Sequence, residues 1–497
     1  MNEEFYKKRK NRWKVGRYML RGRLFNLETI TVIIVAVFLV GLLMIKPIIG
    51  VADNGDFERI MITTGLEYKT SDYNERYFNY VNREYLSTLP FVNGVGYFSS
   101  TVIFVLSAKF ISSIVLFNKG IFDIRFLAAL YCCMLLLFIY LMAKHDKKSV
   151  PIVNFIYIIL TVLIFTDAGY ISYFNSLYGE ALAFTSLLLT LAMAVHLSKS
   201  QNPRVLVLIG FYVAAILLTC AKFQYIPIGV VIAIFSLLFL KLRKDKKWRI
   251  VISTYIAAIL VISVAAYVSI PDVFRVCNKY QSVFYGVLKD SKIPEADLEE
   301  LGLKKEYALL AGTHYFMGKY PINIKDPGFR EEINSKVSPF KVAMFYLRHP
   351  VRYIQKLEVT ANKSFKLILG FGNYEKSHDS APKKEVSSFR VWSDFKDNIL
   401  PHSLWFLFLF FTVYSAILIF QYRKAYGISE KIYFATFLLV MIIGIIQFII
   451  PVICDGEADL SKHLFLFNVC FDIMFIYMVV WLIDSVFASF KRILGRE

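Results

Sequence analysis

Two aspartates and a glutamate stand directly after a long apolar run near the start of the chain. They are Asp53, Asp56 and Glu58 in VADNGDFERIM, residues 51–61. Gly55 allows the backbone to turn sharply between the two aspartates. Carboxylates that lie close together raise one another's pKa or bind a cation, and either property suits a general base. The alternative interpretation is a loop whose acidic side chains face water.

A second acidic segment lies between two apolar runs, in TDAGYISYFNSLYGEALAF, residues 166–184. It holds Asp167, Asn175 and Glu180 among several tyrosines. Glu180 begins the next predicted helix, where the positive end of the helix dipole favours a carboxylate, and tyrosines are common at membrane surfaces. These two properties alone could explain the segment. Two acidic loops on the same side of a membrane can also converge on one cleft.

Two further segments carry cations near the same predicted membrane surface. Lys222 occupies a tight turn in CAKFQYIP, where it either extends toward the headgroups or binds a lipid phosphate. Residues 454–472, CDGEADLSKHLFLFNVCFD, offer five charged or titratable side chains outside the membrane, namely Asp455, Glu457, Asp459, Lys462 and His463.

The last predicted span carries two polar residues one helical turn apart. They are Asn468 and Asp472. An ionisable side chain inside a span is costly, so its presence indicates a function.

The composition is that of a membrane protein with many spans. The chain has 497 residues, of which 57% are hydrophobic and 16% aromatic. Its mean hydropathy is +0.53. Long apolar blocks of this kind indicate a polytopic membrane protein. The net charge of +19 is best explained by basic cytoplasmic loops, since no basic and aromatic stripe on a soluble module indicates a nucleic-acid partner.

Charge decides how many apolar runs span the membrane. If residues 98–117 lie flat as an interfacial helix interrupted by Lys109, the basic segments such as KHDKK and KLRKDKKWR all fall on one side. This favours about ten spans over eleven, with both termini cytoplasmic. The predicted spans are about 28–50, 124–143, 150–166, 179–197, 204–221, 223–242, 249–270, 402–421, 431–452 and 463–486.

The fold class predicted from these patterns is an all-α polytopic integral membrane protein with a mostly helical outer insert. Its parts are a basic cytoplasmic N-terminus (1–27), an N-terminal transmembrane core (28–270) with an acidic first outer loop (51–123), an extracytoplasmic insert subdomain (271–401) and C-terminal transmembrane helices with a basic tail (402–497). The insert is polar enough to fold as a small soluble unit.

These features together resemble the GT-C glycosyltransferases, membrane enzymes that use polyprenyl-linked sugar donors. VADNGDFERIM is similar to the family's carboxylate-bearing first outer loop, and YFNSLYGEA to its second acidic position. More narrowly, DNGDF, NSLYGE, FYGVLKDS, LGLKKEYALLAG and DGEADLSKHLFLFN look like bacterial glycan-biosynthesis hexose transferases of this type (Wsf-like), over most of the chain. The aspartate–glutamate pair of protein mannosyltransferases is absent.

The resemblance implies transfer of a hexose on the outer face of the bacterial cytoplasmic membrane. The donor would be a polyprenyl-phosphate hexose, and the acceptor a cell-envelope glycan or teichoic-type polymer, with inversion at the anomeric carbon. Asp56 would be the base, with Asp53 as the other possibility. These two would also be the ligands of a divalent cation, if one is used.

The resemblance also implies roles for the other polar residues. Glu180 and Asn175 would hold sugar hydroxyls or orient the base. Lys222 would face the leaving phosphate, with Lys462 or His463 as alternatives. Asp167 and Glu457 complete the candidate substrate contacts.

Three other classes remain open. A transporter or flippase of lipid-linked glycans places ionisable groups near mid-membrane, often in two related halves, and no repeat is visible in this sequence. A scaffold protein would not need the acidic residues. A polymerase or ligase of lipid-linked oligosaccharides would require a preassembled repeat unit as its donor.

Overall fold

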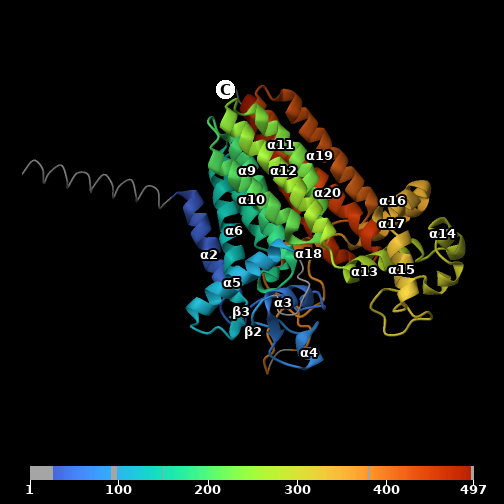
Figure 1. Ribbon diagram of the computed structural model, residues 1–497. Helices are drawn as coiled ribbons and strands as arrows, with labels where there is room; N and C mark the ends of the chain where they lie inside the picture. The colour runs from blue at the N-terminus through green and yellow to red at the C-terminus, as the bar shows by residue number, and fades with distance from the viewer. Residues whose placement is uncertain (1–25, 91–97, 149, 379–380, 494–497) are drawn as a thin grey trace, which may run out of the picture.

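The chain forms a bundle of long helices with two elaborate connections gathered at one end (Figure 1). The computed structural model describes residues 26–90, 98–148, 150–378 and 381–493. Almost all of the predicted basic N-terminus therefore lies outside the described residues. The prediction of a mainly helical membrane protein is confirmed.

Seven helices among the described residues are long and apolar enough to cross a membrane. They are α6 (Arg125–His145), α9 (Gly179–Lys199), the run η2–α11–η3 (Phe223–Lys241), α12 (Lys246–Val268), α19 (Leu404–Lys424), α20 (Ile428–Asp455) and α22 (Phe465–Ile493).

Three shorter apolar helices coincide with the other predicted spans. They are α2 (Leu27–Leu43), α7 (Pro151–Phe165) and α10 (Val205–Ala221). The α7 helix makes a 46° bend with the segment Ala168–Asn175, which contains α8 (Ala168–Ile171) and η1 (Ser172–Asn175), and the pair could form one broken span. The count of ten spans remains a prediction.

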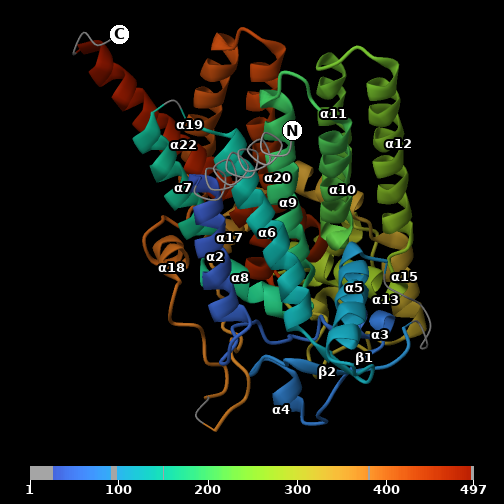
Figure 2. The ribbon, with the colours of Figure 1, turned by 90° about the vertical axis from the view of Figure 1, so that its left-hand side faces the viewer.

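The connections alternate between the two ends of the bundle. The first long connection and the insert lie at one end, which we name the loop-rich end, and the described C-terminal end of α22 lies at the other (Figures 1 and 2). The opposite end holds basic residues of the short connections, among them Lys144, Lys148, Lys199 and Lys244. This arrangement agrees with the alternation of loops that the charge pattern predicts.

The first long connection contains a small antiparallel sheet that the sequence did not predict. Its strands are β1 (Leu66–Tyr68), β2 (Glu84–Ser87) and β3 (Ile121–Asp123), in that order, with Leu66 opposite Ser87 and Glu84 opposite Asp123. Strands of three or four residues are too short for an alternating pattern to be recognised. Two short helices, α3 (Glu58–Thr64) and α4 (Tyr73–Arg76), lie beside them.

The segment predicted to be an interfacial helix is helical, as α5 (Ser100–Val115), and its place at the membrane surface remains a prediction. It lies obliquely across the loop-rich end of the long helices (Figure 1) and packs on α6 and α10. Lys109 does not interrupt it, because its ammonium donates to the carbonyl oxygens of Thr64 and Thr88 at 2.7 and 2.5 Å and so caps the end of α3. Ile103 and Phe110 are exposed, as an interfacial helix requires.

The insert is helical, as predicted. Its elements are α13 (Asp272–Ser282), η4 (Val283–Val287), α14 (Pro294–Glu300), η5 (Lys305–Leu310), α15 (Pro327–Lys336), α16 (Pro339–Arg348), α17 (Pro350–Lys363) and α18 (Val391–Asn398). Four of these helices begin at a proline, which is favourable in the first turn because its missing N–H would be unpaired there.

The structure divides the insert into two parts. Residues up to about 353 build their own apolar core around Tyr280, Phe284 and Phe345. The later part packs on the bundle and the first connection instead. For example, the side chain of Asn373 donates to the Gly50 carbonyl at 2.7 Å.

Asp472 in α22 fixes this later part to the bundle. Its carboxylate pairs with the Lys396 ammonium at 2.8 Å and accepts from the Trp392 indole N–H at 2.8 Å and from the Tyr170 hydroxyl. Lys396 and Asp472 are completely buried. The charge inside the last span is therefore a structural anchor. The side-chain amide of Asn468, also in α22, likewise holds the insert by donating to the Ser364 carbonyl.

Lys396→Met leaves the Asp472 carboxylate buried without its cation. Removing one partner of a buried pair costs about 3–5 kcal/mol, so we expect a clearly lower thermal unfolding temperature in detergent. Lys325→Met, at an exposed position of the insert, is the control and should leave that temperature unchanged. An unfolding temperature of Lys396→Met equal to that of the control would refute the anchoring role.

Candidate functional site

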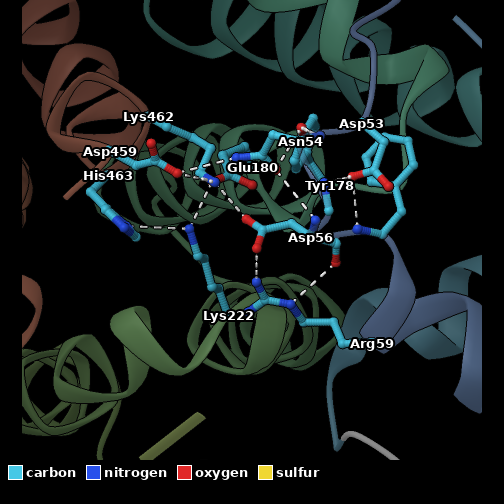
Figure 3. Close-up of polar contacts among 12 residues, drawn as sticks. Asp53, Asn54, Asp56, Arg59, Tyr178, Glu180, Lys222, Asp459, Lys462 and His463 are labelled. Atoms are coloured by element: carbon cyan, nitrogen blue, oxygen red, sulfur yellow. Dashed lines mark hydrogen bonds and ion pairs between the residues drawn. The ribbon is translucent and has the colours of Figure 1, made fainter. Parts of the chain in front are cut away.

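Charged side chains from four separate segments meet at the loop-rich end of the bundle (Figure 3). We name this set the charged junction. Its members are Asp56 and Arg59 of the first connection, Glu180 at the start of α9, Lys222 after α10, and Asp459, Lys462 and His463 before α22.

The close approach of α9 and α10 brings Glu180 and Lys222 together. The Lys222 ammonium lies 2.9 Å from a Glu180 carboxylate oxygen, and both residues are buried. Gly179 permits this approach, because a Cβ there would meet the Ala221 carbonyl oxygen at 2.7 Å. The glycine of NSLYGE is therefore required by packing.

The connection before α22 is held by the insert. Gly456 has φ +60°, and a Cβ on it would meet the Gln281 carbonyl oxygen at 2.6 Å and the Gly286 nitrogen at 2.7 Å. Glu457 pairs with Lys289, and with Lys356 at 2.6 Å. The segments FYGV and DGEAD thus pack directly on each other and place Asp459 and Lys462.

Asp53 shapes the turn of the first connection and does not reach the junction. One carboxylate oxygen accepts from the Gly55 and Phe57 N–H groups at 2.8 and 3.0 Å, and the other accepts from the Tyr68 hydroxyl at 2.6 Å. Asp53 is 1% exposed, and this burial raises the pKa of its carboxyl to about 6. Both oxygens of this carboxylate therefore bind groups of the first connection itself.

Asp56 faces the junction. Its carboxylate pairs with Arg59, one turn later on α3, and with the Lys462 ammonium at 2.5 Å. Burial alone would raise the pKa of Asp56, but Arg59, Lys462 and Lys222 outweigh it and hold that pKa well below its usual range. The side chain keeps a quarter of its surface exposed, so a ligand can reach it.

Lys462 is the central cation. It is 3% exposed and lies between the carboxylates of Asp56 and Asp459, the latter at 3.2 Å, with its ammonium 5.7 Å from the centre of the Tyr178 ring. Burial by itself lowers the pKa of Lys462, but Asp56, Asp459 and Glu180 raise it above its ordinary value. The ammonium therefore stays charged at neutral pH.

His463 extends the junction into the bundle. Its Nε2 lies 2.8 Å from an Asp455 carboxylate oxygen, and its Nδ1 lies 2.9 Å from the Gln224 side-chain oxygen. Gln224 also donates to Gln447 of α20 at 3.0 Å. Nδ1 of His463 is 3.5 Å from the Lys222 ammonium, which completes a continuous polar chain.

Five of the predicted site residues thus come together, namely Asp56, Glu180, Lys222, Lys462 and His463. The other four lie apart, in structural contacts.

Asn175 donates to the Leu43 and Ile49 carbonyls at 3.0 and 2.8 Å. Asp167 accepts from the backbone N–H groups of Trp392 and Ser393 at 2.9 and 3.1 Å. The predictions of Asp167 and Asn175 as substrate contacts do not agree with these surroundings, because both side chains are buried and hold chain segments together. The carboxylates of Asp53 and Glu457, described above, are likewise used in contacts that hold chain segments together.

Sequence reasoning missed Arg59 and Gln224. Arg59 stands three residues after Asp56, the spacing of neighbours on a helix, and that spacing was the available signal. Gln224 follows Lys222 in CAKFQYIP, where only the lysine was a candidate, and nothing in the sequence connected Gln224 with His463.

The carboxylates do not fit a divalent cation in this arrangement. Asp53 accepts hydrogen bonds from two N–H groups and a hydroxyl, and Asp56 is paired with two cations. Within the part of the chain that the structure describes, no group of three or more His, Cys, Asp and Glu side chains gathers as a metal site would require.

A family model described as the YfdI N-terminal transmembrane domain matches residues 9–494, nearly the whole chain. The chain belongs to this family. No curated protein matches it. In this YfdI-type domain, the junction supplies two accessible carboxylates, Asp56 and Asp459, beside three cations. Such a set is able to accept a proton and to hold an anion at neighbouring positions.

Asp53→Asn should keep the fold, because an amide oxygen can accept the same two N–H bonds and the amide N–H₂ can donate to Tyr68. Asp53→Ala leaves these donors unpaired and should cost about 1–3 kcal/mol of unfolding free energy. Thermal unfolding of the purified variants measures the difference. Equal unfolding temperatures for the two variants would contradict the assigned role.

A comparison of the wild type with Asp53→Asn tests the raised pKa of Asp53. The folded state binds its proton up to about pH 6 and the unfolded state only to about pH 4, so ionisation destabilises the folded wild type as pH rises through this window. Relative to Asp53→Asn, the wild type should lose up to about 3 kcal/mol between pH 4 and pH 7. A difference that is constant with pH would count against the shift.

Proposed function

We propose that this protein transfers a hexose from a polyprenyl-phosphate donor to a cell-envelope glycan acceptor, by an inverting GT-C mechanism on the outer face of a bacterial cytoplasmic membrane. The observation that carries the proposal is the accessible Asp56 carboxylate beside the buried cations Lys222 and Lys462. Such a set matches the two needs of this reaction, a proton acceptor and a partner for the leaving phosphate.

Asp56 accepts the acceptor's proton in this proposal. The acceptor oxygen bonds to the anomeric carbon as the bond from that carbon to the phosphate oxygen breaks, and the hydroxyl proton passes to Asp56. The carboxylate also faces the positive charge that develops on the sugar. The lipid phosphate leaves with the electron pair and is stabilised by Lys222 and Lys462.

The low pKa of Asp56 makes it a weak base before substrate binds. A donor phosphate close to Lys462 shares the ammonium that now lies 2.5 Å from Asp56. Sharing weakens the cation's hold on the carboxylate, and the pKa of Asp56 rises toward its ordinary value. Donor binding therefore activates the base.

The alternative is a transporter or flippase of lipid-linked glycans. A second charged group does lie at the opposite end, where Asp146 pairs with Lys148 and Lys199 at 2.9 and 2.8 Å. Between the two ends, however, α9 carries fully packed apolar residues such as Phe184 and Leu188. A polar substrate would need a path through this layer, so the transferase is the better-supported function.

Asp56→Asn should abolish transfer. With purified protein in lipid, labelled undecaprenyl-phosphate hexoses and crude cell-wall acceptor, we expect a fall of about 100-fold or more, since general base catalysis contributes at least this much. Asp53→Asn is the matched control and should keep most of the activity, because it acts only in the turn. A wild-type rate of transfer by Asp56→Asn, or no transfer by the wild type, would refute the proposal.

The proposed orientation has its own test. A cysteine in place of Lys319, exposed in the insert, should react with a membrane-impermeant maleimide on intact cells. A cysteine in place of Lys244, in a short connection at the opposite end, should react only after permeabilisation. The reverse pattern would place the junction in the cytoplasm and exclude an outer-face reaction.

A further inference from the structure

A basic cavity opens beside the charged junction. It has a volume of about 420 Å³ and lies between the end of η4, the end of α17 with the segment after it, and the connection before α22. Four lysines line it, namely Lys289, Lys363, Lys366 and Lys462, with Tyr285 and Phe371 among the other walls. We name it the lysine cavity.

The lysine cavity is continuous with the proposed reaction centre. Asp459 and Lys462 line the cavity and also belong to the junction. Lys462 in turn contacts Asp56 at 2.5 Å. A ligand held in the cavity is therefore one side chain away from the proposed base.

The lysines of the cavity differ in how far their charge is already neutralised. Lys289 pairs with Glu457, and Lys462 with two aspartates. Lys363 and Lys366 are exposed, and no ion pair joins either of them to another residue within the described ranges. Glu457 and Asp459 also line the cavity, but Lys289, Lys356 and Lys462 already pair with them. The charges of Lys363 and Lys366 therefore remain unmatched by an ion pair and make the cavity attractive to an anion.

The fold holds these two lysines in place. The Ser461 hydroxyl donates to the Lys363 carbonyl at 3.3 Å, which joins the end of α17 to the connection before α22. Phe365 and Leu367, on either side of Lys366, are buried in the main core. The backbone that carries both cations is thus anchored before any ligand arrives.

We infer that the lysine cavity binds a phosphate group of the glycan substrate, with Lys363 and Lys366 as its principal cations. Tyr285 and Phe371, which line the same cavity, are the aromatic contacts for the sugar attached to that phosphate. The inference deepens the proposed function and rests on it for the nature of the substrate. The phosphate belongs either to the lipid-linked donor or to a phosphate-bearing acceptor.

Binding of small phosphates to the full-length protein in lipid nanodiscs tests this without any sugar transfer. Two probes separate the sources, farnesyl phosphate for the lipid-borne phosphate of the donor and glycerol 3-phosphate for the phosphate of a teichoic-type acceptor. The variant is Lys363→Met combined with Lys366→Met. The control is Lys319→Met combined with Lys325→Met, which removes the same charge from exposed positions of the same insert.

We expect the dissociation constant of at least one probe to rise tenfold or more in the cavity variant. The control should bind both probes with wild-type affinity. Weakened farnesyl phosphate binding assigns the cavity to the donor, and weakened glycerol 3-phosphate binding assigns it to the acceptor. Equal affinities in the two variants, or no binding of either probe to the wild type, overturn the inference. If the cavity variant loses phosphate binding while the wild type shows no sugar transfer, the inference about the cavity is supported and the proposed function is refuted.

Discussion

The structure depends on the burial of the Lys462 ammonium between carboxylates from distant parts of the chain. A lysine that is 3% exposed is tolerable only if its charge is matched, and Asp56 and Asp459 provide that match. Asp56 lies 406 residues earlier in the sequence. The ion pair between Asp56 and Lys462 therefore joins the first long connection to the connection before α22. The elements between these two residues must fold so that the two side chains meet.

The insert helps to bring Asp56 and Lys462 together. Gly456 packs against Gly286, and Glu457 joins Lys289 and Lys356, so the connection before α22 takes its shape from the insert. The buried pair of Lys396 and Asp472 anchors the later part of the insert to the last helix. The insert is thus a template for the charged junction and also a wall of the lysine cavity.

The sequence indicated the helices well because apolar runs of about 20 residues leave few alternatives in a membrane. It indicated five residues of the junction because charges at a membrane boundary are conspicuous. It did not distinguish Asp56 from Asp53, since this depends on which carboxylate the turn itself uses. Asp167 and Asp472 were misread for the same reason, because their backbone and cationic partners lie more than 70 residues away along the chain.

A double-mutant comparison of Asp56 and Lys462 tests the central claim most directly. Sugar transfer would be measured for Asp56→Asn, Lys462→Met and the two combined, each in folded protein in lipid. If the pair acts as one unit, each change alone removes nearly all transfer, and the combination is no slower than the slower single variant. Losses that simply multiply would mean that the two residues act independently, and the account of the junction as a single catalytic unit would be wrong.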